Sequence, residues 1–146
     1  MYIFKIILPE LLLKQRKDIV LRIIGSFIME NSDMHLKNFS LKETEPGNRK
    51  FQLSKAYDMF PVNIVMSEDK EQLALTINGK KRNIHKKEFL ILATSCEIPM
   101  NAAKHMIEKT CSQKDKLLQM VDAAYLSEEQ KDRIKELIVE RIEILS

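Results

Sequence analysis

Two neighbouring features constrain the fold most. They are the spacing of the apolar residues in 17–30 and the polar stretch that follows this segment. Asn31-Ser32-Asp33 follows this segment directly, and such side chains favour loops because they compete for backbone hydrogen bonds. The apolar spacing is that of an amphipathic helix with one buried face, which predicts a helix ending in a polar loop near residue 30. The apolar positions are Ile19, Val20, Ile23, Ile24, Phe27 and Ile28.

A small hairpin is predicted after the loop. Strand-like residues at 39–42 and 51–53 flank Glu45-Pro46-Gly47-Asn48, which is a strong turn signal. A third strand-like run covers 73–77 and precedes the turn dipeptide Asn78-Gly79.

The remainder of the chain is helical by pattern. Helices are predicted at about 86–95, from near Pro99, at about 113–124, and from Ser127 to about Leu145. Ser127 and Gln130 match a capping box at the start of the last helix. We therefore expect a mainly α chain with a small β-hairpin, folded as a single domain over residues 1–146.

Composition narrows the classes of partner and compartment. A net charge of +3 and a pI near 8.8 fall short of a nucleic-acid-binding footprint, so no direct nucleic-acid binding is expected. The apolar run at 2–13 is shorter than the roughly 20 residues that span a bilayer, and it lacks the features of a secretory signal. The expected compartment is the cytoplasm. Cys96 and Cys111 are isolated in the sequence, and we interpret both as reduced thiols with a packing role.

The loop after the first helix concentrates residues that can carry chemistry. Asp33 and Asn38 are five residues apart, the spacing of the catalytic aspartate and the metal-binding asparagine in a kinase catalytic loop. Between them lie His35 and Lys37, and a second acid follows at Asp58. Such a set suits phosphoryl transfer from Mg-ATP, which needs positioning and charge neutralisation.

Each residue has an expected role in that chemistry. Asp33 would accept the proton of the attacking hydroxyl, and Lys37 would neutralise charge on the transferred group. Asn38 and Asp58 would offer oxygen ligands to Mg²⁺. His35 is expected to pack in and to orient the loop by hydrogen bonding.

Simpler readings of the same residues stay open at this point. The polar loop can be a capped turn whose side chains satisfy local backbone donors, on an otherwise unremarkable helical domain. His85 and His105 have no chemical partners nearby in sequence and are expected on helix surfaces or partly packed.

The motif Asp-x-His-x-Lys-Asn-x-Ser within Asn31–Ser40, followed by Leu53–Met59 and Glu71–Lys81, resembles the C-terminal region of HipA-like serine/threonine kinases. These are the toxin halves of bacterial toxin–antitoxin pairs. The resemblance runs from about residue 18 to the end and leaves 1–17 as a non-matching extension.

The resemblance implies a kinase-like fold with a helical C-lobe that phosphorylates a protein hydroxyl with Mg²⁺ and ATP. It makes Asp33 the catalytic aspartate, with His35 and Lys37 in the same motif, and Asn38 and Asp58 the Mg²⁺ ligands. It also implies restraint by a helix-turn-helix antitoxin.

One departure from the family concerns the nucleotide-covering lobe. The three glycines, Gly25, Gly47 and Gly79, are too far apart to form a glycine-rich phosphate loop. We therefore expect an isolated C-lobe that is inactive alone. The alternative is a non-catalytic interaction module that binds an antitoxin, a chain supplying the missing lobe, or a second copy of itself.

Overall fold

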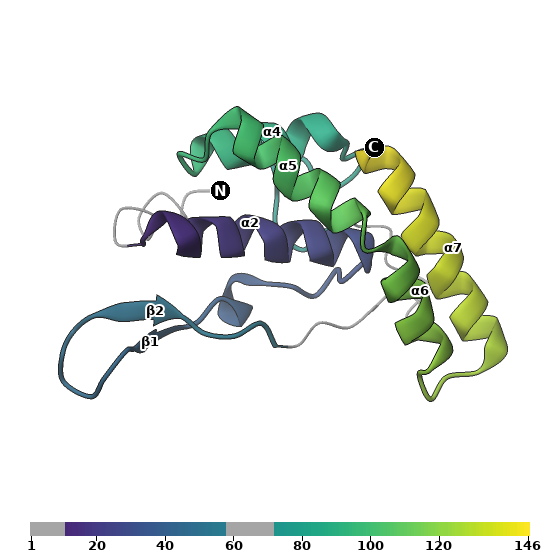
Figure 1. Ribbon diagram of the computed structural model, residues 1–146, viewed down its shortest axis with the longest axis horizontal. Coiled ribbons are helices and arrows are strands. Elements are labelled where there is room, and N and C mark those ends of the chain that lie inside the picture. The colour runs from purple at the N-terminus through teal and green to yellow at the C-terminus, as the bar shows by residue number, and fades with distance from the viewer. Residues whose placement is uncertain (1–10, 58–71) are drawn as a thin grey trace.

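The computed structural model describes residues 11–57 and 72–146, which form a mainly helical structure with one two-stranded hairpin (Figure 1). None of the helices in these ranges is long and apolar enough to cross a membrane. Asp58 lies outside the described residues. The elements are α2 (Leu13–Ile28), a 3₁₀ turn η2 (Leu36–Asn38), β1 (Leu41–Glu43), β2 (Phe51–Leu53), α4 (Lys86–Ser95), α5 (Met100–Cys111), α6 (Lys114–Asp122) and α7 (Glu128–Leu145).

The helix α2 is the centre of the fold. In Figure 1 it runs through the middle of the molecule, with α4 and α5 on one side and the hairpin on the other. Phe27 is 0% exposed, and its ring meets that of Phe89 edge-on with 5.1 Å between the centroids. All six apolar positions that predicted this helix are buried, which confirms the amphipathic pattern.

The predicted hairpin is confirmed. Antiparallel β1 and β2 pair Leu41 with Leu53 and Glu43 with Phe51. The Glu43 carboxylate accepts a hydrogen bond from the backbone N–H of Gly47 at 2.8 Å. Gly47 has a φ of +80°, a backbone conformation that favours glycine and closes the turn.

Two side chains of α2 attach the hairpin to the helix. The Gln15 amide Nε2 donates to the carbonyl oxygen of Phe51 at 3.3 Å, near the start of α2. The Arg22 guanidinium donates to the carbonyl oxygen of Ser54, just after β2. The exit of β2 is therefore fixed to α2 by a charged hydrogen bond.

The prediction of a strand at 73–77 is wrong. Only Ile77 makes a β-bridge, with Lys80 across the Asn78-Gly79 turn. The neighbouring residues Leu73 and Ala74 are both buried, so burial does not alternate along this segment as it does in a half-buried strand. The segment instead contributes apolar side chains to the core as irregular structure.

The C-terminal helices agree with the predicted pattern. Pro99 is the N-cap of α5, and α6 lies inside the predicted range 113–124. The capping box of α7 is present, since the N–H of Gln130 donates to the Ser127 hydroxyl at 3.3 Å. Cys96 is buried in the core, and desolvation by burial raises the pKa of its thiol. Both cysteines are free thiols.

Candidate functional site

The loop that carries the predicted site leaves α2 in a fixed direction. Glu30 has a φ of +47°, a left-handed conformation that costs a non-glycine residue about 1–2 kcal/mol. The next N–H, that of Asn31, donates to the carbonyl of Ser26 at 2.8 Å. The Glu30 carboxylate pairs with the buried guanidinium of Arg141 in α7 at 2.7 Å. The last helix of the chain thus stabilises the bend that precedes the loop.

Asp33 and His35 contact each other on the surface of the loop. The Nε2 atom of His35 lies 3.0 Å from Oδ1 of Asp33, and the side chains are 50% and 52% exposed respectively. The Asp33 N–H donates to the side-chain oxygen of Asn31 at 3.3 Å, which holds the turn. His35 was expected to pack in and to orient the loop, but its side chain is half exposed and contacts the Asp33 carboxylate at the surface.

Asn38 ends the short turn η2 and is 2% exposed. Its N–H donates to the carbonyl of His35 at 3.0 Å. Lys37 precedes it and is exposed to solvent. The loop thus carries an exposed acid, an exposed cation and a buried amide within six residues.

Tyr57 connects this loop to the segment after β2. Its hydroxyl donates to the carbonyl oxygen of Lys37 at 2.8 Å and lies 2.6 Å from the hydroxyl of Ser40. Sequence reasoning gave Tyr57 no role. The available signal was its place directly before Asp58, the second predicted metal ligand.

The predicted metal ligands fit Mg²⁺ by donor chemistry, because amide and carboxylate oxygens are the ligands that this ion prefers. Residues 11–57 and 72–146 hold no group of three histidine, cysteine or acidic side chains placed to bind a metal. Asn38 is placed in the loop, whereas the position of Asp58 is not described.

The model of the HipA-like C-terminal domain matches residues 3–118, which is more than half of the chain. The chain belongs to the HipA-like C-terminal domain family. The match starts before residue 18, where we placed the resemblance, and ends within α6. A search of curated proteins finds no match to the chain.

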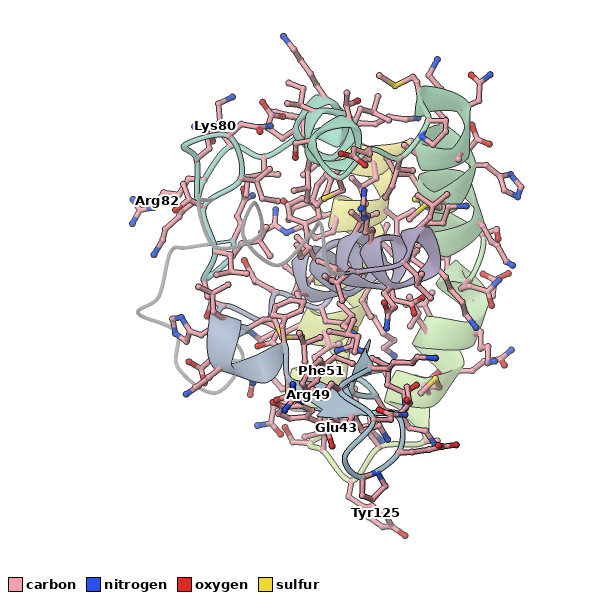
Figure 2. All side chains as sticks on the ribbon, turned by 90° about the vertical axis from the view of Figure 1, so that its left-hand side faces the viewer. Glu43, Arg49, Phe51, Lys80, Arg82 and Tyr125 are labelled. Atoms are coloured by element: carbon pink, nitrogen blue, oxygen red, sulfur yellow. The ribbon has the colours of Figure 1, made fainter. Side chains whose placement is uncertain are left out.

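This HipA-like domain also has a groove between the start of α2 and the hairpin, of about 830 Å³. Both apolar and polar side chains line it, and two of the apolar ones are strongly exposed, Leu12 at 74% and Phe51 at 51%. Lys14, Arg49 and Lys50 add positive charge to its walls, and Asp18 adds one negative charge. Figure 2 shows Arg49 and Phe51 close together on the hairpin.

Proposed function

We propose that this chain is the C-terminal catalytic lobe of a HipA-like serine/threonine protein kinase, the toxin of a toxin–antitoxin pair. The observation that carries the proposal is the loop itself. Asp33 is half exposed and oriented by His35, while Asn38, five residues later, is set in a hydrogen-bonded turn. Membership of the HipA-like family supports the same reading.

The reaction assigns one step to each side chain. The oxygen of a protein hydroxyl attacks the γ-phosphorus of ATP, the bond to the β,γ-bridging oxygen breaks, and ADP leaves with the electron pair. Asp33 accepts the proton of the attacking hydroxyl, and His35 holds that carboxylate in place across 3.0 Å. Lys37 is exposed and supplies positive charge toward the transferred phosphoryl group.

Asn38 and Asp58 would hold the magnesium ion. Bound there, Mg²⁺ would neutralise the phosphate charges that oppose attack. The burial of Asn38 suits this role, because a buried side chain has little rotamer freedom left to lose on binding the ion.

The other half of the nucleotide site is expected from a second lobe. The three glycines of the sequence cannot form a phosphate-covering loop. We therefore propose that these 146 residues alone transfer no phosphoryl group, and that turnover requires an added N-terminal lobe.

A calorimetric titration with Mg-ATP tests the nucleotide site. We expect the parent chain to bind with a dissociation constant below about 1 mM, worth about 4 kcal/mol, and Asp58→Ala to bind no nucleotide in a Mg²⁺-dependent manner. Asp115→Ala, which removes an exposed carboxylate from α6, is the control and should bind like the parent. Equal affinities in the parent and Asp58→Ala would contradict the metal-ligand assignment.

A second candidate function is a non-catalytic interaction module, and the groove beside the hairpin favours it. Leu12 and Phe51 expose apolar surface beside this groove, which a partner chain could cover. Sedimentation equilibrium of the parent and Phe51→Ser tests for a second copy as that partner. A mass above 17.1 kDa that returns to the monomer in the variant would support this function. A monomeric parent that binds Mg-ATP would favour the kinase lobe.

A further inference from the structure

We propose that Tyr57 is a positioning residue that sets the place of Asn38 by fixing the main chain on both sides of it. This inference rests on the proposed function, because it concerns how the same loop holds its metal ligand. The observation behind it is the pair of contacts made by one hydroxyl group, to the carbonyl of Lys37 and to the side chain of Ser40.

The first contact acts on the peptide unit that joins Lys37 to Asn38. The carbonyl of this unit accepts a hydrogen bond from the Tyr57 hydroxyl at 2.8 Å. The N–H of the same unit donates to the carbonyl of His35 at 3.0 Å. Both polar groups of the peptide are therefore engaged, which fixes the plane from which the Asn38 side chain departs.

The second contact acts two residues after Asn38. Tyr57 uses its single hydroxyl hydrogen for the Lys37 carbonyl, so the Ser40 hydroxyl must be the donor in the 2.6 Å contact between the two side chains. The Ser40 carbonyl in turn accepts a hydrogen bond from the Ser54 N–H at 2.8 Å. The hydroxyl of Tyr57 thus contacts the chain on both sides of Asn38, at Lys37 and at Ser40.

The segment that carries Tyr57 is itself anchored. The Arg22 guanidinium in α2 donates to the carbonyl of Ser54, and desolvation by burial lowers the pKa of Arg22. Tyr57 is therefore the end of a short segment tied to α2 at one side and to the loop at the other. A side chain that binds a metal ion needs support of this kind to keep its geometry.

The test compares three variants in which a single hydroxyl is removed. Tyr57→Phe deletes the Tyr57 hydroxyl and Ser40→Ala deletes one of its partners. Tyr125→Phe is the matched control, because Tyr125 is fully exposed and projects away from the body of the molecule (Figure 2). Two quantities are measured in each protein: the hydrogen-exchange rate of the Asn38 amide by NMR, and the Mg²⁺-dependent affinity for ATP.

We expect Tyr57→Phe to accelerate exchange at the Asn38 amide and to weaken Mg-ATP binding about fivefold to tenfold, the worth of one net hydrogen bond. Ser40→Ala should change both quantities in the same direction and by less. Tyr125→Phe should change neither, and in Tyr57→Phe exchange should accelerate more at the Asn38 amide than at the amides of α5.

The remaining outcomes separate the inference from the proposed function. Unchanged exchange at Asn38 in Tyr57→Phe would overturn the inference, whatever the nucleotide result. Faster exchange with unchanged Mg-ATP affinity would overturn it too, because the hydroxyl would then only hold the loop. If the parent binds no Mg-ATP, the proposed nucleotide site fails, and faster exchange confined to residues 36–40 would still support Tyr57 as the residue that places Asn38.

Discussion

The two sides of α2 are held by different interactions. On the side of α4 and α5, close-packed apolar side chains such as Phe27 and Phe89 fill the core. On the side of the hairpin, directed hydrogen bonds from Gln15 and Arg22 to backbone carbonyls add to the packing of partly buried side chains such as Leu41 and Leu53. We therefore expect the larger loss of stability from changes on the first side, whereas the short turn η2 of the candidate loop lies on the second (Figure 1).

The largest effect is expected on the packed side. Phe27→Ala should lower the free energy of unfolding by about 3–5 kcal/mol, because it empties a fully buried site between Phe89 and Arg141. Phe51→Ala removes the same side chain from the exposed face of the hairpin and should cost less than about 1 kcal/mol. Urea unfolding of the two variants measures both. Similar losses in the two would mean that the sides do not differ in stability.

A smaller effect is expected where the two sides meet. Glu30→Ala removes the carboxylate that pairs with buried Arg141 and should cost about 2 kcal/mol. Glu140→Ala removes the other acid that contacts Arg141, and it should cost less than about 0.5 kcal/mol because that carboxylate is mostly exposed. Urea unfolding at neutral pH compares them. An equal loss in the free energy of unfolding for both variants would contradict the claim that α7 stabilises the bend before the loop.

The smallest effect concerns the pH dependence of stability. The hydrogen bond from Lys80 lowers the pKa of Glu88 below its ordinary value, with the N–H of His85 contributing. An acid whose pKa is lowered by folding stabilises the protein above its unfolded-state pKa, and this stabilisation is lost as the pH falls through the folded-state pKa. Between about pH 6 and pH 3, the parent should therefore lose more stability than Glu88→Gln. Parallel pH profiles of the two proteins would contradict this.

The sequence could predict the parts of the structure that depend on near neighbours. The apolar spacing of α2, the turn at Glu45–Asn48 and the capping box at Ser127 each act within a few residues, and each prediction is confirmed. The prediction of a strand at 73–77 failed because strand-like residue types do not reveal that two adjacent side chains, Leu73 and Ala74, are both buried. Strand formation depends on a neighbouring strand, which no local pattern supplies.

The candidate site also combines contacts between near neighbours, which the sequence could predict, with contacts between distant residues, which it could not. Asp33 contacts His35, and the N–H of Asn38 donates to the His35 carbonyl, because all three residues lie within six positions of one loop. The contact of Tyr57 with Lys37 spans 20 residues, and that of Glu30 with Arg141 spans 111. Such contacts depend on how distant segments pack, so no local spacing in the sequence could predict them. The role of Asp58 stays a prediction, since this residue lies outside the described part of the chain.

The most direct test of the central claim is to map where Mg-ATP binds, using the backbone amide spectrum of the parent chain. The account predicts that Mg-ATP shifts the signals of residues 33–40 and of Tyr57, and that the amides of α5 and α7 keep their positions. Shifts confined to other surfaces, or no shifts at millimolar Mg-ATP, would contradict a nucleotide site on this loop.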